Sequence, residues 1–571
     1  MRPTAKTVGG FQVSVMSKKK SLLSQQAAEN TLNLNPVVGP QGRDILGTTQ
    51  KLLRHAISSP FTSAGHAISL GRELKNVLLG RSQLQPEAGD RRFGDPAWAQ
   101  SPLFRRYMQV YLAWRGEMDE WLDSAGLSEQ ELSRGKFVVS LLTDALAPTN
   151  TLANPAALKR LLDTGGKSLL DGLGNLARDL VSNGGMPSQV DKSAFEVGGN
   201  LATTEGAVVF RNEALELIQY QPTTELVHER PLLVIPPQIN KYYVFDLTPE
   251  KSLVRYAVGS GLQTFVVSWR NPTTAQREWG LSTYIEALKE AVDAVLAITG
   301  SDDLNLLGAC SGAITMVTLL GHYAALGEHK VNAFTQMVSV LDWEMDGDVT
   351  LFADEKSLEV ARRRSYQSGV LEGRDMARVF AWMRPNDLIW NYWVNNYLLG
   401  KEPPAFDILY WNNDTTRLPA ALHGELVDMF KSNPLSRANA LEVAGTPIDL
   451  SRVTQDFYCL AGLTDHITPW EACYRSARLL GGKCEFVLSS SGHIQSILNP
   501  PGNPKARFVT GAELVENPLD WKAGASAHGG SWWPHWQAWL TERSGASKKA
   551  PRKPGNRAFP ALEPAPGRYV R

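Results

Sequence analysis

The sequence predicts an α/β protein in which a helical N-terminal region precedes a parallel β-sheet. From about residue 205 onward, short β-branched apolar runs recur mostly without alternation, as is typical of strands buried on both faces. Helical stretches such as 282–299 separate several of these runs, and this order of strands and helices favours a parallel sheet. Before residue 205, apolar side chains recur at steps of three and four, which indicates helices instead.

The helical region is expected over residues 46–200, after a polar and weakly periodic segment, 1–45, that is expected to be flexible. Apolar and aromatic side chains follow a helical stripe over 103–121, which indicates an amphipathic helix. Ser128 and Glu131 then form the capping-box pattern that starts a further helix. The stripe is interpreted as packing rather than as a ligand site.

The sheet is expected within residues 201–543, starting with a hairpin that turns at Arg211, Asn212 and Glu213. Its further strands are expected at residues 231–237, 263–269, 304–308, 333–342, 456–462 and 484–489.

The alternation of predicted strands and helices is interrupted over about 343–445, where tryptophan and tyrosine are frequent. An aromatic insertion between two core strands is typical of a lid or cap over an active site, and an ordinary helical excursion of the core is the alternative. Residues 544–571 are rich in proline and basic side chains, which predicts a disordered tail. Such a tail either stays solvated or contacts an acidic surface.

Composition argues against several classes of function. The 58 basic side chains equal the 58 acidic ones, so charge gives no reason to expect nucleic acid or an anionic membrane as the main partner. Four cysteines without C-x-x-C spacing favour neither a disulfide framework nor a zinc site, and Cys459, Cys473 and Cys484 are expected to be buried free thiols. No apolar run approaches the roughly 20 residues of a membrane helix. The start lacks the apolar core of a signal peptide, so the chain is expected to be cytoplasmic, with Met1 or Met16 as its first residue.

The stretch "LNLLGACSGAIT", residues 304–315, carries a nucleophile motif. An apolar strand runs into Gly308, Cys310 and Gly312, which reproduce the G-x-S-x-G elbow of serine hydrolases with cysteine in place of serine. Small residues are needed on both sides because this strand-to-helix turn is strained and brings backbones close together. The amides at the start of the following helix favour a thiolate.

A nucleophile elbow needs a base and an orienting acid, which in the α/β-hydrolase fold follow the nucleophile in the order acid, base. Asp465 comes just after the strand expected at 456–462, and His493 comes just after the next strand, in a Ser/Gly loop. The sequence therefore predicts an α/β-hydrolase fold with a catalytic triad of Cys310, Asp465 and His493. His466, beside the acid, is expected to have a structural role or to face the substrate.

Two backbone amides are expected to bind the oxyanion of the reaction. The first is that of Ser311, because it follows the nucleophile directly. The second is expected in the loop after an earlier strand, at Ile239 or Asn240, where Pro236 and Pro237 stiffen the turn. A rigid turn without a catalytic part is the alternative for this loop.

A cysteine nucleophile favours acyl transfer. When a thiol attacks a thioester, one thioester replaces another with little change in free energy, so the acyl group stays activated on the enzyme. A cysteine elbow beneath an aromatic lid that excludes water therefore favours transfer from a thioester to an alcohol. His493 would deprotonate Cys310 and then the acceptor hydroxyl, while Asp465 holds and stabilises the imidazole.

The same motifs belong to a longer resemblance that spans roughly residues 17 to 545. The blocks that carry it include "RPLLVIPPQINKYYVFDL", "FVVSWRNP", "NLLGACSG", "NDLIWNYWVNNYLLG", "PPAFDILYWNNDTTRLP", "AGLTDHITPWEACYRS" and "SGHIQSILNPPGNPKARF". With these blocks the sequence strongly resembles polyhydroxyalkanoate synthases, especially the class II enzymes of pseudomonads that polymerise medium-chain 3-hydroxyacyl-CoA. The family triad falls on Cys310, Asp465 and His493. One departure is Ala313, where the family usually has glycine; its methyl group could tighten the acyl pocket and is not expected to abolish activity.

The resemblance implies transfer of 3-hydroxyacyl groups from coenzyme A thioesters to a growing polyester on cytoplasmic granules. It also implies a homodimer, contact with the granule surface and with granule-associated proteins, and no metal or bound cofactor. Two alternatives stay open: a thioesterase or polyester depolymerase of the same fold, and a granule-coating protein with a degenerate site. The cysteine in the elbow argues against the first, and the intact order of the triad argues against the second.

Overall fold

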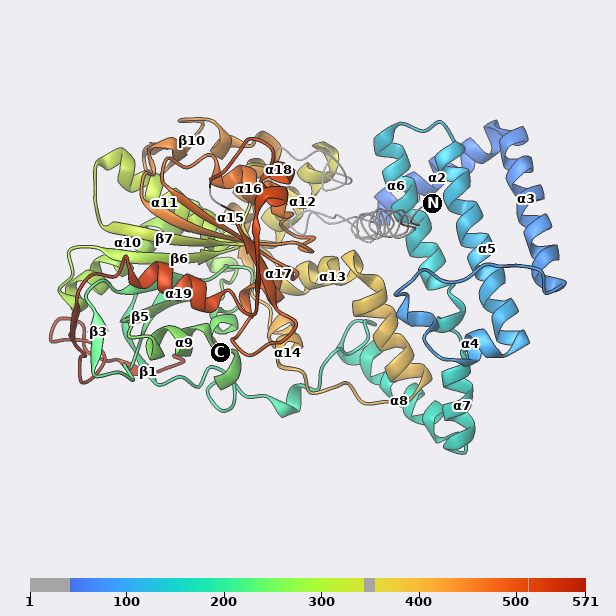
Figure 1. Ribbon diagram of the computed structural model, residues 1–571, viewed down its shortest axis with the longest axis horizontal. Coiled ribbons are helices and arrows are strands. Elements are labelled where there is room, and N and C mark those ends of the chain that lie inside the picture. Colours follow the sequence, from blue (N-terminus) through green and yellow to red (C-terminus); the bar gives the residue numbers. More distant parts are fainter. Residues whose placement is uncertain (1–41, 344–354, 512) are drawn as a thin grey trace, which may run out of the picture.

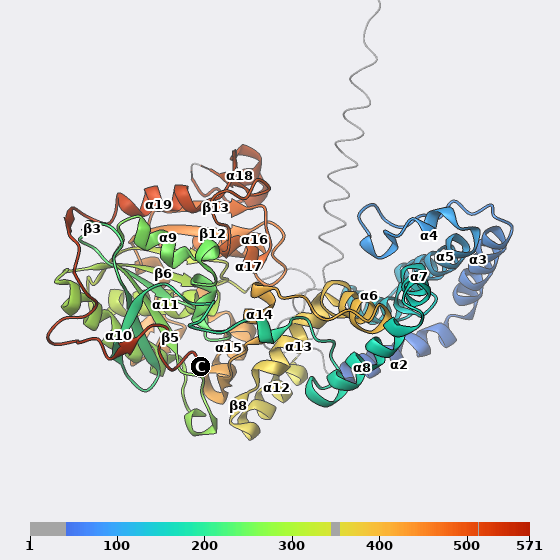
Figure 2. The same ribbon diagram turned by 90° about the horizontal axis from the view of Figure 1, so that it is seen from below.

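The computed structural model of the chain describes residues 42–343, 355–511 and 513–571. Figures 1 and 2 show a helical N-terminal part beside a C-terminal part built around a sheet. Met16 and most of the segment expected to be flexible lie outside the described residues, and the end of that segment belongs to a helix that begins at Gly42. No helix of the described residues has the length and apolarity needed to cross a membrane.

The N-terminal part is helical, as expected. Its helices are α2 (Gly42–Ser58), α3 (Pro60–Leu78), α4 (Ala97–Gln100), α5 (Pro102–Ser124), α6 (Glu129–Ala145), α7 (Pro155–Asp163) and α8 (Lys167–Ser182). The expected cap of α6 is present, since the backbone N–H of Glu131 donates to the Ser128 hydroxyl at 3.3 Å. The aromatic stripe of α5 is buried at Tyr111 and Trp121, whereas Leu103 at its start is 72% exposed. The stripe therefore packs most completely over its later turns.

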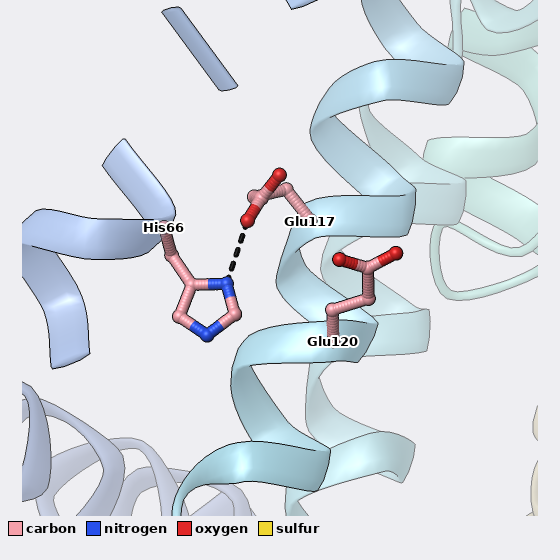
Figure 3. Close-up of side chains that lie close together, drawn as sticks. All are labelled: His66, Glu117 and Glu120. Carbon is pink, nitrogen blue, oxygen red and sulfur yellow. Dashed lines mark hydrogen bonds and ion pairs between the residues drawn. The ribbon is translucent and has the colours of Figure 1, made fainter. Parts of the chain in front are cut away.

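A largely apolar cavity of about 670 Å³ is lined by residues of α2, α3, α5 and α6. Among its lining residues, His66 of α3 places Nδ1 2.6 Å from a carboxylate oxygen of Glu117 on α5 (Figure 3). The other ring nitrogen of His66 lies 2.9 Å from the Ser124 hydroxyl. With Glu120, His66 and Glu117 form the one group of potential metal ligands found among the described residues. Both ring nitrogens already have partners, so His66 fastens α3 to α5.

The C-terminal part contains one eleven-stranded sheet in the described residues, in the order β15-β14-β13-β12-β7-β6-β4-β5-β2-β1-β17. The six strands from β13 to β5 in this order are parallel, and antiparallel strands extend the sheet at both edges. The strand bounds in the sheet are β1 (Gly206–Arg211), β2 (Leu215–Tyr220), β4 (Leu232–Ile235), β5 (Thr264–Trp269), β6 (Leu304–Ala309), β7 (Val331–Met337), β12 (Asp456–Gly462), β13 (Cys484–Ser489), β14 (Arg507–Thr510), β15 (Ser526–Gly529) and β17 (Glu563–Pro564). The predicted hairpin and every predicted core strand are present, which confirms the α/β fold class.

Helices pack on both faces of this sheet because its central strands are apolar on both sides. In β4, Leu233 belongs to the core completed by α10 and α11, and Val234 belongs to the core completed by α9 and α19. Successive strand residues face opposite sides, so the two cores lie on opposite faces. The helices around the sheet are α9 (Leu253–Gly259), α10 (Leu281–Thr299), α11 (Ser311–Leu326), α16 (Trp470–Ala477), α17 (His493–Ile497), α18 (Pro518–Gly524) and α19 (Trp533–Thr541).

The aromatic-rich insertion leaves the sheet after β7 and returns at β12. Its described elements are α12 (Glu355–Ser368), β8 (Val370–Leu371), α13 (Gly373–Met383), the π-helices η8 (Asn386–Trp390) and η9 (Trp393–Leu398), α14 (Asp407–Asn413), β9 (Leu418–Pro419), α15 (Ala420–Ser432) and the hairpin of β10 (Leu441–Val443) with β11 (Thr446–Ile448). Figure 1 shows α13 between the sheet and the N-terminal helices. The insertion thus joins the two parts of the molecule.

The C-terminal tail is ordered, so the prediction of disorder over 544–571 was wrong. Its strand β16 (Ser547–Lys549) pairs with β3 (Leu226–His228), and β17 pairs with the sheet edge β1. The backbone N–H groups of Arg568 and Tyr569 donate to the buried Glu216 carboxylate, both at 3.0 Å, and Val570 is 1% exposed. Composition averages over a segment, so it could not predict the few specific contacts that order this tail.

Candidate active site

Cys310 stands at the turn between β6 and α11. Its φ of 50° and ψ of −126° are rare for a residue with a side chain, and this is the strain expected of a nucleophile elbow. Neighbouring backbone holds the turn in place. The Cys310 N–H donates to the Met337 carbonyl at 3.0 Å, and the Ser339 hydroxyl donates to the Cys310 carbonyl at 3.0 Å.

The two glycines of the elbow are required by close packing. A Cβ at Gly312 would lie 2.4 Å from the carbonyl oxygen of Ile235 and 2.5 Å from that of Pro236. A Cβ at Gly308 would lie 2.8 Å from the Cα of Ala313, which is fully buried. All these neighbours are backbone atoms, so a side chain at Gly312 would push α11 away from the end of β4, and one at Gly308 would push α11 away from β6.

Asp465 and His493 meet because they follow neighbouring parallel strands, β12 and β13, whose carboxyl ends share one edge of the sheet. His493 Nδ1 lies 2.7 Å from Asp465 Oδ2. The backbone N–H groups of Ile467 and Thr468 donate to Asp465 Oδ1 at 2.9 and 3.0 Å, and the Thr468 hydroxyl donates to Oδ2 at 2.7 Å. The sequence interpretation missed both Thr468 and Ser339. Thr468 lies only three residues after the acid, and this spacing could have indicated that its hydroxyl bonds Asp465.

Electrostatics couple these side chains to Cys310. Burial alone would lower the pKa of His493, but the charged Asp465 carboxylate and hydrogen bonds with Asp465 and Cys310 raise it to about 10. Burial would likewise raise the pKa of Asp465, but His493 and Thr468 together lower it below its usual range. The structure thus brings the three predicted residues together, with an ionised carboxylate and a strongly basic imidazole.

The remaining cysteines are free thiols in settings that suppress their reactivity. Cys459 and Cys473 are buried, as expected, whereas the Cys484 residue is partly exposed at the first position of β13. Burial raises the pKa of all three thiols. Because the thiolate is the reactive form, none of the three is suited to attack a substrate at neutral pH.

The loop after β4 lies against the start of α11. Ser311 is the first residue of α11, so its backbone N–H has no carbonyl partner within the helix. The Gln238 backbone N–H donates to the Ser311 hydroxyl at 3.2 Å, and Asn240 pairs with Thr415 of the insertion in an isolated β-bridge. The loop that carries both expected second donors, Ile239 and Asn240, is therefore anchored beside the elbow.

The insertion also reaches the acid side of the site. Burial lowers the pKa of His466 to about 4; Asp465 opposes this shift, Arg384 adds to it, and Asp387 opposes it. Arg384 and Asp387 belong to the corner between α13 and η8. At neutral pH, His466 is therefore an uncharged ring within electrostatic reach of both the triad and the insertion.

Known proteins resemble this chain along nearly its whole length. Residues 89–257 match the family described as "Poly-beta-hydroxybutyrate polymerase (PhaC) N-terminus", and residues 223–500 match the alpha/beta hydrolase fold. The chain is 68% identical to poly(3-hydroxyalkanoate) polymerase 1 of Ectopseudomonas oleovorans over 97% of its own length and 99% of that protein. It is 54% identical to polymerase 2 of the same organism, over 94% and 96% of the two chains.

A more distant relative is the poly(3-hydroxyalkanoate) polymerase subunit PhaC of Cupriavidus necator. It is 42% identical over 86% of this chain and 85% of its own length. The alignments with the two Ectopseudomonas oleovorans proteins extend over nearly the whole chain. By this extent of similarity, the chain belongs to the poly(3-hydroxyalkanoate) polymerase family and has the α/β-hydrolase fold.

Proposed function

We propose that the chain polymerises 3-hydroxyacyl groups, of medium chain length, from CoA thioesters into a polyester carried on Cys310. The observation that carries the proposal is a cysteine at a nucleophile elbow, next to an imidazole bound by a buried carboxylate. The names of the similar proteins support the polymerase activity. The resemblance to class II enzymes supports the medium chain length.

The first half-reaction loads the acyl group. His493, with a pKa near 10, already holds the proton that Cys310 gives up, and the thiolate attacks the thioester carbonyl to form a tetrahedral oxyanion. The Ser311 amide and a second amide, at Ile239 or Asn240, stabilise this charge. When the C–S bond to CoA breaks, the leaving thiolate takes the proton from His493, and the acyl group stays on Cys310 as a new thioester.

The second half-reaction extends the polyester. His493 removes the proton of a 3-hydroxyl group, and the oxygen attacks the thioester on Cys310. An ester bond forms, the C–S bond breaks, and the Cys310 thiolate is left beside the protonated imidazole. Asp465 keeps the ring oriented and stabilises its charge in both halves.

We also propose an oligomeric state and a location for the protein, both of which suit an insoluble polyester product. The protein acts as a homodimer at the surface of cytoplasmic polyester granules, beside granule-associated proteins, and uses no metal or bound cofactor. Exposed apolar side chains on α7 and α8 support contact with such a surface: Leu162 is 80% exposed, Leu170 71% and Val181 90%. Granule co-sedimentation and analytical ultracentrifugation test these two points.

Product analysis distinguishes this function from its alternatives. Purified protein is given 3-hydroxyoctanoyl-CoA and, separately, 3-hydroxybutyryl-CoA, and both CoA and the acyl product are measured. CoA release with insoluble polyester, faster for the longer substrate, is the expected result. Release with only free 3-hydroxy acid would indicate a hydrolase, and no release with either substrate would indicate a granule-coating protein.

A further inference from the structure

The N-terminal helices contact the insertion through polar groups. The Asn175 side-chain amide of α8 donates to the carbonyls of Asn396 and Lys401, both at 3.1 Å. The Tyr397 hydroxyl donates to the Asp179 carboxylate at 2.7 Å. The chains also approach closely, because a Cβ at Gly172 would lie 2.0 Å from the carbonyl oxygen of Tyr397. Helix α8 therefore fixes η9 through directional bonds.

A second polar contact lies at the corner between α13 and η8. The Asn386 amide donates to Asp144 Oδ2 at 2.9 Å, and Arg92 Nη1 donates to Asn386 Oδ1 at 3.4 Å. Arg92 also bonds Asp144 Oδ1 at 2.8 Å and pairs with Asp90 at 2.8 Å. The side chains of Arg92 and Asp144 are only 14% and 9% exposed. Asn386 thus bonds both members of a largely buried ion pair of the N-terminal part, with its amide N–H donating to Asp144 and its amide oxygen accepting from Arg92.

The same corner reaches the active site. Asn386 opens η8, and its near neighbours Arg384 and Asp387 form an ion pair with each other. These two charges act on His466, which directly follows the acid of the triad. A shift of Asn386 would therefore change the electrostatic surroundings of His466.

We propose that Asn386 is a positioning residue through which Asp144 and Arg92 hold the α13–η8 corner in place for binding of the acyl-CoA thioester. The inference rests on the proposed function for the identity of the substrate. An asparagine is needed because one side chain must both donate to a carboxylate and accept from a guanidinium. The N-terminal domain thereby sets how well the catalytic domain binds its substrate.

Exchanging the two partners tests this proposal. Asn386→Asp places a carboxylate against Asp144, and Asp144→Asn removes the charge that Arg92 and Asn386 share. Each single variant is expected to raise the KM for 3-hydroxyoctanoyl-CoA about 3- to 10-fold, the range of coupling through contact networks, with kcat changed less than about twofold. The double variant Asp144→Asn/Asn386→Asp restores one amide–carboxylate pair beside Arg92, and its KM is expected to return to within about twofold of the wild type.

Matched measurements separate positioning from general damage. Asn391→Ala removes an exposed amide of the same segment, whose side chain bonds Asn395 alone among the residues that the structure describes, and this variant is expected to leave KM unchanged. The rate at which iodoacetamide alkylates Cys310 reports on the elbow, and the melting temperature reports on folding. Single variants with unchanged KM, even if less stable, would overturn the proposal. So would a double variant whose KM rises by the product of the single effects, or an equal rise in Asn391→Ala.

The assay also keeps this inference distinct from the proposed function. CoA release gives a KM whether the acyl acceptor is a hydroxyl group or water, so a hydrolase would still reveal the coupling of Asp144 with Asn386. Product analysis alone decides between polymerase and hydrolase. A wild-type chain that released no CoA would overturn both the proposed function and this inference.

Discussion

At the scale of single residues, the thiol of Cys310 is the group that the account depends on most. Cys310→Ala is expected to lower CoA release by about 10⁴-fold or more, the usual cost of removing a triad nucleophile. Cys310→Ser would form an oxoester in place of a thioester, so slow CoA release with mainly free 3-hydroxy acid is expected. Steady-state CoA release measures both effects, with thermal melting as the control for folding. Near-normal polymerisation by Cys310→Ala would contradict the mechanism.

The ion pair of Asp465 and His493 makes a prediction for stability. The pKa of His493 is raised in the folded chain from its ordinary 6.5 to about 10, so its contribution to folding is full below about pH 6.5 and is lost as pH rises through 10. The pKa of Asp465 is lowered, so its own contribution is lost only in acid. Asp465→Asn is therefore expected to melt below the wild type by a gap that is largest near pH 6 and narrows towards pH 10. Melting curves over this pH range test it, and a constant gap would argue against the pair.

The sequence was sufficient to name the three residues that meet at the candidate active site. Cys310 was found from its flanking glycines, and Asp465 and His493 were found from their places after late strands. The supporting hydroxyls of Thr468 and Ser339 were missed. Their partners are a carboxylate and a backbone carbonyl, whose positions become known only once the strands are placed in the sheet.

At the scale of elements, the junction of β4, β6 and α11 is expected to be intolerant of added atoms. Gly312→Ala would place a Cβ within 2.6 Å of the Ile235 and Pro236 backbone, so α11 and Cys310 must move. A displacement of about 1 Å in a catalytic group costs about 10²-fold, and kcat/KM is expected to fall by at least this factor.

The matched control is Gly174→Ala in α8, where a Cβ would have nothing within 4 Å. This variant is expected to keep full activity and to gain up to about 1 kcal/mol of stability from better helix propensity. Equal activity losses in Gly312→Ala and Gly174→Ala would show that the close packing at the elbow is not what matters. Initial rates and melting temperatures of both variants decide the point.

Elements buried on both faces were predictable, whereas elements at the contact between the two parts of the chain were not. The core strands are short, β-branched apolar runs, a pattern typical of strands buried on both faces. Helix α8 reverses the usual pattern: Asn175 and Asp179 are buried against the insertion, while Leu173 and Leu180 are exposed. Hydrophobic periodicity assigns such a helix its length correctly and its packing face wrongly.

At the scale of the whole molecule, the C-terminal tail is expected to stabilise the catalytic domain. Removing residues 544–571 would delete β16 and β17 and the two N–H donors to Glu216, whose side chain is 0% exposed. Two hydrogen bonds to a charged group are worth about 3–6 kcal/mol together, and a loss of this order in the free energy of unfolding is expected. Chemical denaturation of the two chains measures it.

A second variant identifies the cause. Truncation is expected to cost less stability in a Glu216→Gln background than in the wild type, because the Arg568 and Tyr569 N–H groups bond a neutral amide oxygen more weakly than a carboxylate. Unchanged stability on truncation would instead support the disordered tail that composition predicts. Composition alone misjudged the tail because most of its residues are not the ones that fix it. The buried Val570 and the N–H groups of Arg568 and Tyr569 hold the tail in place, and they are outnumbered by proline and basic residues.

The measurement that tests the central claim most directly is intact and peptide mass spectrometry of the protein after exposure to octanoyl-CoA, which lacks the acceptor hydroxyl. The account predicts that one octanoyl group accumulates on the Cys310 peptide with release of one CoA, and that Cys310→Ala forms no such adduct. Continuous release of CoA without an adduct, or an adduct on another residue, would contradict a polyester carried on Cys310.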